Sequence, residues 1–448
     1  MPVQQNLIYT TIGYNSNFLL CMNLLIHSIQ NSHGSNVNFD FLIFIDENMT
    51  YEIPKNLDFN VYIKKVPPAQ SAMLASMQKV NIFDYEYIDN YKKILYIDAD
   101  ILVLKNISFL FDFDLEDKLY AYAESTDNSY HSQIYYGFKN YSKEELEYFQ
   151  DNNIYAFNCG LFLLNNNSNL KQYFKDVVSL IRNNKEEFFY EQSFMNYYFN
   201  KNNLVNYTLF TDKLYLLNSK NNFKDVYIVH FTGFHYSAQD KFNQAIYYLK
   251  VLGYEFINNK IVKLFNTRKD MIKNHIKPNM VGCELGIFEG DFSKELYELM
   301  PKKIYLVDIF EGQMTSGNQD GNFVKTVNLS ESYSNLLKYY KNRNNVQLVK
   351  DYSYNFLQSI NDNSLDYIYI DADHSYEGCK KDLEIAYQKV CKNGLIMGHD
   401  YSINEERCKH QYNFGVNKAV NEFCKEKNLT IEAVSNDGCM SFLIINKK

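Results

Sequence analysis

The chain has 448 residues, and its 45 Lys and Arg residues against 53 Asp and Glu residues give a formal net charge of −8 at pH 7. Because a single hydrophobic core usually stops growing at roughly 250 to 300 residues, we expect two domains. The acidic balance provides no broad basic field for a phosphate backbone, so it disfavours nucleic acid as a partner.

Eight cysteines lie scattered along the chain without a Cys-x-x-Cys pair. This usage favours reduced thiols in a cytosolic protein over a disulfide framework. The amino terminus enters a strand-like run without a basic region followed by a long apolar stretch, and no segment approaches ~18 uninterrupted apolar residues. We therefore expect a cytoplasmic protein without a transmembrane segment.

Strand-like runs alternate with helical patterns over the first half of the chain. In chain order, the pattern predicts a strand at 6–11, a helix at 18–31, and strands at 39–46 and 93–98. Such alternation is typical of an α/β domain with a largely parallel sheet.

A domain boundary is predicted near residue 260, within the helix-prone segment 241–268, which is interrupted near Gly253. We expect a first domain over 1–258 and a second over 259–448. The second half repeats the α/β pattern with helices between five strands of an open sheet. These strands are predicted at 280–285, 303–308, 346–350, 365–371 and 394–398.

The pentapeptide Tyr-Ile-Asp-Ala-Asp occurs twice, at 96–100 and at 369–373, each time at the end of an apolar run. Residues two apart in an extended chain point to the same side, so each copy can direct two carboxylates at one ligand where a strand ends. The flanking residues of the two copies differ, which indicates two different active sites rather than an internal duplication.

In the first copy, Asp98 and Asp100 supply hard oxygen donors that suit Mg²⁺ or Mn²⁺ bound to a diphosphate. A solvated acidic turn is the alternative interpretation of this motif taken alone. Three further segments, at 157–165, 190–196 and 229–233, favour the functional interpretation.

Together with residues 92–103, these segments make the chain from about residue 5 to about residue 240 resemble glycosyltransferase family 8, the group of glycogenin and bacterial lipopolysaccharide hexosyltransferases. The resemblance implies a GT-A-type nucleotide-sugar-binding domain. Its expected reaction is retaining hexosyl transfer from a nucleotide-diphosphate sugar, most often a UDP-sugar.

The same resemblance implies roles for individual residues. The metal ligands would be Asp98, Asp100 and His230. The sugar would contact Asn158 and Gly160, Gln192 would lie beside its reactive face, and the base would meet Tyr14 with Thr10 or Thr11. Taken alone, His230 would be read first as a core histidine bonded to a backbone carbonyl, and the other segments of the resemblance reverse that preference. Glu191 could instead be a solvated helix charge.

One segment departs from the family pattern. The family usually continues from His-Phe-x-Gly to a Lys-Pro-Trp whose lysine contacts the diphosphate, whereas this chain reads Phe234-His235-Tyr236-Ser237. We expect His235 or Lys241 to make the diphosphate contact in place of that lysine.

A glycine turn in the second half lies between a predicted strand and a predicted helix, with Glu284, Gly286 and Gly290 in it. Glycines there let a ligand approach the backbone near a helix N-terminus. The spacing differs from the Gly-x-Gly-x-x-Gly of dinucleotide-binding proteins, which argues against a nicotinamide enzyme. Asp308 ends the next strand and Asp351 follows the third, where either could instead cap a helix.

The order of these elements over roughly 268–445 resembles the Rossmann-like class I S-adenosylmethionine-dependent methyltransferases. Segments 369–378, 398–401 and 415–420 resemble methyltransferase family 24 in particular. The resemblance implies that Glu284, Gly286 and Gly290 line the methionine end of the cofactor, that Asp308 binds the ribose and that Asp351 lies at the adenine side. The residues expected to face the acceptor are Asp371, Asp373, His374, His399 and Asp400.

Methyl transfer to a sugar hydroxyl benefits from a general base or from a cation that stabilises the alkoxide. Asp371, His374 and His399 are the candidate catalytic groups, and Asp371 with Asp400 could instead hold Mg²⁺. The alternative for His374 is a helix-start residue bonded to the backbone.

These features predict a bifunctional enzyme that transfers a hexose and methylates a sugar hydroxyl of a glycan, glycolipid or glycoprotein. It would use Mn²⁺ or Mg²⁺, a UDP-sugar and S-adenosylmethionine. The alternative is a methyltransferase whose first half is a non-catalytic glycan- or nucleotide-sugar-binding module, which the altered segment after Gly233 motivates.

Overall fold

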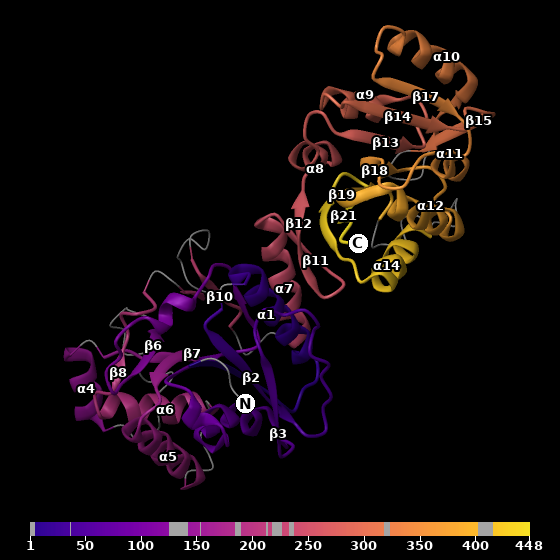
Figure 1. The fold of residues 1–448 in the computed structure, drawn as a ribbon. Helices are drawn as coiled ribbons and strands as arrows, with labels where there is room; N and C mark the ends of the chain where they lie inside the picture. Colours follow the sequence, from indigo (N-terminus) through magenta and orange to yellow (C-terminus); the bar gives the residue numbers. More distant parts are fainter. Residues whose placement is uncertain are drawn as a thin grey trace. The chain divides into compact units, whose positions relative to one another are not determined.

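A computed structural model describes residues 5–35, 37–124, 142–152, 154–183, 190–211, 214–216, 226–232, 237–317, 323–401 and 415–448. The chain forms two compact units, Met1–Tyr248 and Leu249–Lys448. Figure 1 shows that strands and helices alternate in each, so both are α/β. The predicted boundary at 258/259 lies about ten residues beyond this division and stays a proposal.

The first unit is built on a seven-stranded sheet of order β3-β2-β1-β4-β7-β6-β8. Neighbours from β3 to β4 run parallel, and β7 runs antiparallel to both β4 and β6. The strands are β1 (Asn6–Ile12), β2 (Phe39–Asp46), β3 (Val61–Val66), β4 (Lys93–Ile97), β6 (Leu119–Ala123), β7 (Phe157–Asn165) and β8 (Val205–Asn206). All eight residues of β2 are buried, as expected of a central strand covered on both faces.

A three-stranded sheet of order β5-β10-β9 adjoins the carboxyl end of β4 in sequence. Its strands are β5 (Ile101–Val103), β9 (Leu214–Leu216) and β10 (Ile228–His230). The helices of the unit are α1 (Phe18–His33), α2 (Ala72–Ser76), α4 (Lys143–Asp151), α5 (Ser168–Asn183), α6 (Tyr190–Lys201) and α7 (Ala238–Val251), with 3-10 helices η1 (Met77–Asp84), η2 (Ile88–Asn90) and η3 (Ser108–Phe111).

The second unit contains a nine-stranded sheet of order β11-β12-β20-β21-β19-β18-β13-β14-β17. The five consecutive strands from β19 to β17 run parallel, and β21 is antiparallel to its neighbours β19 and β20. The strands are β11 (Tyr254–Ile257), β12 (Lys260–Phe265), β13 (Val281–Leu285), β14 (Lys303–Asp308), β17 (Val346–Lys350), β18 (Leu365–Ile370), β19 (Val390–Gly398), β20 (Ile431–Ser435) and β21 (Phe442–Ile445). A hairpin of β15 (Gln313–Gly317) and β16 (Phe323–Asn328) forms a separate sheet.

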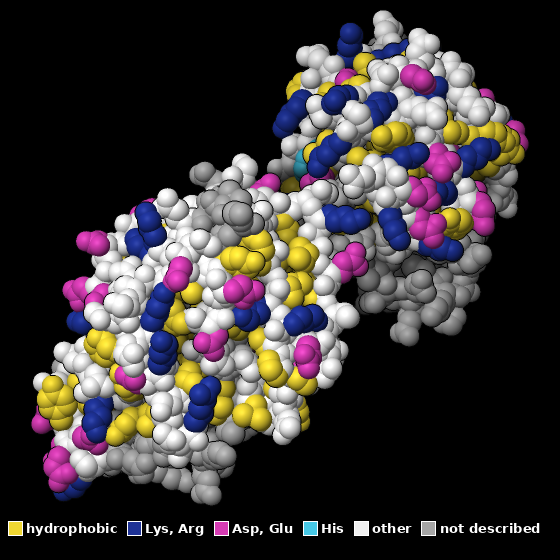
Figure 2. Space-filling view, turned by 60° about the horizontal axis from the view of Figure 1, so that its bottom comes forward, with side chains coloured by type: hydrophobic (Ala, Val, Ile, Leu, Met, Phe, Trp, Pro, Cys, Tyr) yellow, Lys and Arg dark blue, Asp and Glu magenta, His cyan; other side chains and the backbone are white. Residues whose placement is uncertain are grey.

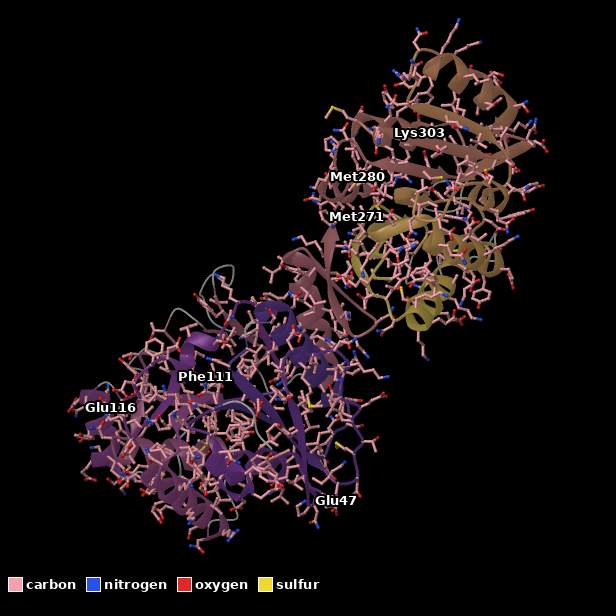
Figure 3. All side chains as sticks on the ribbon, viewed as in Figure 1. Glu47, Phe111, Glu116, Met271, Met280 and Lys303 are labelled. Carbon is pink, nitrogen blue, oxygen red and sulfur yellow. The ribbon has the colours of Figure 1, made fainter. Side chains whose placement is uncertain are left out.

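The helices of the second unit alternate with its strands along the chain. They are α8 (Arg268–His275), α9 (Asp291–Glu298), α10 (Leu329–Tyr340), α11 (Ser353–Ser359), α12 (Tyr376–Lys389) and α14 (Val416–Lys427). In Figure 3, Met280 and Lys303 mark the edge at which β13 and β14 begin. The residues with predicted functions lie at the opposite, carboxyl edge.

The helix predicted over 241–268 is wrong beyond Val251, because residues 254–265 form the hairpin β11–β12. Asn258 and Asn259 both adopt positive φ at its turn, at 49° and 60°. Asparagine tolerates that conformation, and two such residues in succession favour a two-residue hairpin turn. Ile257 and Val262 are buried against the core of the second unit, so tertiary packing stabilises the strands.

The surface and the thiols agree with the composition. Figure 2 shows basic and acidic side chains interspersed on the visible face of each unit. Within the described parts of the chain, no helix is both long enough and apolar enough to span a bilayer. The seven described cysteines are free thiols, and Cys408 lies outside the described residues.

Candidate active sites at the strand ends

The first site lies in the connection between the two sheets of the first unit. Strand β4 ends at Ile97 and β5 begins at Ile101, so Asp98 and Asp100 occupy the link. Strand β10 pairs antiparallel with β5 and sets His230 opposite Ile101. Sheet pairing therefore brings a histidine from a distant segment to the two aspartates.

The ligand atoms of Asp98, Asp100 and His230 all lie within 4.8 Å of one another. His230 Nε2 is 3.2 Å from Asp100 Oδ1 and 3.7 Å from Asp98 Oδ2. Asp100 is 8% exposed and His230 3% exposed, and His230 Nδ1 has no hydrogen-bond partner among the described residues. Two carboxylates and an imidazole converging in this way fit a divalent cation such as Mn²⁺ or Mg²⁺.

Two ammonium groups flank the carboxylates. Lys79 Nζ in η1 lies 3.2 Å from Asp98 Oδ1 and 2.7 Å from Glu191 Oε1, and Lys241 of α7 pairs with Asp100 Oδ2. Burial opposes the ionisation of Asp100, but Lys241 and His230 together hold the pKa of that carboxyl well below its usual value. The carboxylate therefore stays charged and able to bind a cation.

Gly160 on β7 leaves the room that this cluster needs. A Cβ at this position would lie 2.1 Å from His230 Cε1 and 2.7 Å from Asp98 Oδ2. The Gly160 N–H donates to Asn158 Oδ1 at 2.8 Å, and the Cys159 N–H donates to Gln192 Oε1 at 3.0 Å. The predicted sugar-binding residues Asn158, Gly160 and Gln192 thus form one connected group beside the metal cluster.

The residues predicted to meet the base lie at the end of β1. Tyr14 is 56% exposed with φ 63°, so its ring is accessible for stacking on a base. Thr10 is fully buried within β1, and Thr11 Oγ1 lies 3.2 Å from Tyr96 OH. His235, one of the two candidates for the diphosphate contact, lies outside the described residues.

The second site lies at the carboxyl edge of β13 and β18. Gly286 and Gly290 adopt positive φ, 83° and 79°, which L side chains rarely do. A Cβ on Gly286 would lie 2.0 Å from the backbone oxygen of Asp371, and one on Gly290 would lie 2.4 Å from Leu336 Cδ2. Both positions of the predicted cofactor turn therefore require glycine.

Asp308 and Asp351 both make local contacts at the strand ends. Asp308 Oδ2 accepts hydrogen bonds from the Ile287 N–H at 2.7 Å and the Phe288 N–H at 3.1 Å, so this side chain braces the glycine turn. Asp351 Oδ1 accepts from the Tyr352 N–H at 2.7 Å, just before α11. A cofactor could still donate hydrogen bonds to the carboxylate lone pairs of Asp308 and Asp351 that the backbone N–H groups do not use.

Glu284, at the end of β13, is the most enclosed acid of this edge. It is 2% exposed, and its Oε2 has no hydrogen-bond partner among the described residues. Burial raises the pKa of Glu284 to about 8, and the nearby Asp371 and Asp308 carboxylates act in the same direction. A cationic ligand group would relieve this cost, which fits the predicted methionine end of the cofactor.

The predicted acceptor residues form a histidine–carboxylate cluster. His374 Nδ1 lies 2.7 Å from Asp400 Oδ2, and His399 Nδ1 lies 3.3 Å from Asp400 Oδ1 and 3.8 Å from Asp371 Oδ1. Burial acts to lower the pKa of both histidines, but Asp400 and Asp371 together outweigh it, so the pKa of each is raised. Asp373 instead accepts from the Ser375 N–H at 2.9 Å, in the turn before α12.

Two chemistries fit this cluster. The ligand atoms of Asp371, His374 and Asp400 lie within 4.8 Å of one another, as a metal site requires. A carboxylate-oriented imidazole is equally suited to general base catalysis.

Two basic residues beside the sites were not predicted. Lys79 bridges Asp98 and Glu191, and Arg268 Nη1 of α8 lies 3.6 Å from Asp371 Oδ2. Neither belongs to a motif or follows a predicted strand. Their places depend on how η1 and α8 pack, for which the local sequence carries no signal.

Comparison with protein families gives two matches. The model of glycosyl transferase family 8 matches residues 6–236, which is more than half of the chain. A methyltransferase domain model matches residues 283–401. No curated protein matches the chain as a relative.

Solved structures resemble each half. The bifunctional glycosyltransferase WbbM is 16% identical, with a TM-score of 0.36 and coverage of 52% of this chain and 46% of that chain. A mutant of LgtC is 16% identical with a TM-score of 0.35, covering 54% and 95% of the two chains. The N-methyltransferase NodS from Bradyrhizobium japonicum is 11% identical with a TM-score of 0.29, covering 46% and 96%. The chain thus spans about half the length of WbbM.

Proposed function

The chain belongs to glycosyl transferase family 8 and carries a methyltransferase domain besides, and on that premise we propose that it is a bifunctional glycan-modifying enzyme. The first unit would transfer a hexose from a UDP-sugar with retention of configuration. The second would transfer the methyl group of S-adenosylmethionine to a sugar hydroxyl of a glycan, glycolipid or glycoprotein. We place these activities in residues 1–258 and 259–448 of a cytoplasmic protein.

In the first reaction, Asp98, Asp100 and His230 would hold Mn²⁺ or Mg²⁺. Such a cation neutralises the charge that develops on a departing nucleotide diphosphate. Asn158 and Gly160 would bind sugar hydroxyls, with Gln192 beside the reactive face. Lys241 contacts Asp100 from α7, which makes it the described candidate for the diphosphate contact that the altered segment after Gly233 no longer provides.

In the second reaction, Glu284, Gly286 and Gly290 would enclose the methionine end of the cofactor, Asp308 would bind the ribose, and Asp351 would lie at the adenine side. The cofactor supplies an electrophilic methyl group. His374, oriented by Asp400, would accept the proton of the acceptor hydroxyl, and Asp400 would stabilise the imidazolium that forms. His399 lies beside the carboxylates of Asp371 and Asp400. Asp371 and Asp400 would hold Mg²⁺ if a metal takes part.

The convergence of Asp98, Asp100 and His230 in a family 8 domain is the observation that carries the proposal. Calorimetric titration of the intact chain with UDP plus Mn²⁺ tests it. We expect binding by the wild type and by the exposed-site control Asp89→Asn, and loss of Mn²⁺-dependent binding in Asp98→Asn. A titration of all three proteins with S-adenosylhomocysteine should give equal affinities, because the second site is separate. Binding of UDP without dependence on Mn²⁺ would contradict the proposed metal site.

A non-catalytic first unit is the second candidate, and one observation favours it. Lys79 and Lys241 contact the carboxylates that would hold the metal, as in a site neutralised by the protein itself. A unit of this kind would bind UDP and release no free sugar or transferred hexose from a UDP-sugar. Turnover of radiolabelled UDP-hexoses therefore separates the two candidates.

A further inference from the structure

Three loops meet at the edge of the second sheet where β13, β14 and β17 begin, which we call the amino edge. Lys303 marks this edge in Figure 3. The loops are 276–280, 299–302 and 341–345. The Asn279 N–H donates to the backbone oxygen of Met300 at 2.9 Å, and the Asn345 side chain donates to that of Pro301 at 2.8 Å. Hydrogen bonds therefore join the three loops into one surface.

This surface is positively charged in a chain whose formal net charge is −8. The three loops contain no acidic residue, and their basic residues are Lys277, Lys302, Lys341 and Arg343. The three lysines are exposed. The acids that border the loops have partners of their own, since Glu298 pairs with Lys269 at 3.8 Å and Asp366 accepts from the Val281 N–H at 2.7 Å. The amino edge therefore presents a cluster of four cations.

An apolar side chain projects from the same surface. Met300 is 66% exposed, although methionine is among the residues most often buried. Its φ is 56°, a conformation that L side chains rarely adopt. Both of its backbone groups are hydrogen-bonded, because its N–H donates to the Tyr297 backbone oxygen at 3.1 Å and its oxygen accepts from Asn279. A fixed backbone thus holds this side chain in solvent beside the cations.

We infer that the amino edge docks the second unit on an anionic lipid surface. Met300 enters the interface, and the four cations lie at the phosphate head groups. Peripheral membrane binding combines insertion of apolar side chains with attraction to anionic lipids. A soluble polyanion would use the cations but leave Met300 in water, so the observations favour lipid. 

Docking at this edge leaves the second candidate active site open, because that site lies at the opposite, carboxyl edge of the sheet. The inference depends on neither of the two proposed reactions, and the loss of either reaction would leave it unchanged.

Co-sedimentation of the full-length chain with lipid vesicles tests the inference. We expect binding to vesicles of phosphatidylcholine mixed with phosphatidylglycerol, and none to phosphatidylcholine alone. High salt should weaken the binding by at least about tenfold, because it screens charges at a surface. Lys302→Glu combined with Lys341→Glu should lower the affinity by about tenfold or more, and Met300→Gln by about threefold or more.

Two control proteins match these variants. Lys55→Glu combined with Lys175→Glu makes the same change of net charge at two exposed lysines of the first unit, and it should bind within about twofold of the wild type. Met300→Leu keeps an apolar side chain and should also retain binding. Equal losses in the two double variants, or no loss in Lys302→Glu with Lys341→Glu, would overturn the docking surface.

A fluorescence measurement decides the matter if the charge variants do not fold. The chain contains no Trp, so Met300→Trp introduces a single fluorophore at the surface. Its emission should shift to shorter wavelength when mixed vesicles are added, and an unchanged spectrum overturns the inference. Tighter binding of the wild type to a single-stranded oligonucleotide than to mixed vesicles, lost in Lys302→Glu with Lys341→Glu, would assign the surface to nucleic acid instead.

Discussion

At the scale of single residues, the same residue type serves different purposes at the two strand edges. Asp98 and Asp100 converge with a histidine, whereas Asp308 accepts backbone N–H groups that hold a turn. Glu284 is enclosed without a hydrogen bond to its Oε2. Neighbouring groups and burial therefore determine whether a carboxylate is a ligand, a brace or a buried acid.

Glu284 makes the stability of the second unit depend on pH. Its pKa is raised from an ordinary 4.5 to about 8 in the folded chain, so between these values the folded state holds a proton that the unfolded state lacks. The resulting stability is fully present below the ordinary pKa and is lost as pH rises towards about 8. We expect the melting temperature of this unit to fall by at least about 2 °C from mildly acidic to mildly basic pH, and the fall to shrink in Glu284→Gln. Thermal unfolding of both proteins measures this, and identical pH profiles would contradict it.

Gly160 provides a second residue-level prediction. A methyl group there collides with His230 and Asp98, so we expect Gly160→Ala to weaken Mn²⁺ binding by about tenfold or more. Titration of Mn²⁺ followed by electron paramagnetic resonance measures the affinity. Gly13→Ala is the control, since a Cβ there would approach Ala75 Cβ at 3.2 Å and touches no metal ligand. Unchanged Mn²⁺ affinity in Gly160→Ala would remove His230 or Asp98 from the metal site.

At the scale of elements, the hairpin β11–β12 extends the methyltransferase sheet at its β20 edge. Residues 263–265 of β12 pair in parallel with residues 433–435 of β20. Ile257 and Val262 are buried, at 5% and 4% exposure. The hairpin therefore belongs to the core of the second unit and is no loose linker.

We expect a fragment over 249–448 to be more stable than one over 266–448, which lacks the hairpin. Burial of Ile257 and Val262 contributes roughly 1.5 to 3 kcal/mol each, so the shorter fragment should lose about 3 kcal/mol or more. Urea unfolding followed by circular dichroism measures the difference. Equal free energies of unfolding would show that the hairpin adds nothing to the unit.

At the scale of the whole molecule, one chain carries a family 8 domain and a methyltransferase domain. A covalent link raises the effective concentration of the product of one site at the other, which is useful only if both reactions act on one glycan. A shared glycan is therefore the functional consequence that we propose for the fusion.

We expect the intact chain to produce methylated, glycosylated acceptor faster than an equimolar mixture of its two separated halves at low micromolar enzyme. Mass spectrometry of the acceptor over time measures both products. Intact Asp98→Asn supplied with pre-glycosylated acceptor is the control, and it should methylate at the wild-type rate. Equal rates for the intact chain and the mixture would contradict a shared glycan.

Much of the fold could be predicted, because buried parallel strands are apolar runs with recognisable ends. The predicted bounds of β2, β14 and β17 coincide with the observed strands, and the two-domain α/β class and both family resemblances are confirmed. The prediction was wrong at 254–265, and β20 and β21 were not predicted. These short segments are neighbours on one side of the sheet, where tertiary pairing decides the conformation more than local pattern does.

The sequence by itself determined the two α/β domains and the strand ends at which acidic residues gather, because periodic burial and turn residues are local properties. Only the tertiary structure decided which groups meet there. It brought His230 to Asp98 and Asp100, set Lys79 against Glu191, and placed Arg268 beside Asp371. These contacts depend on how distant segments pack. The same packing buries Glu284 and raises its pKa, because electrostatic and desolvation energies act through space rather than along the chain.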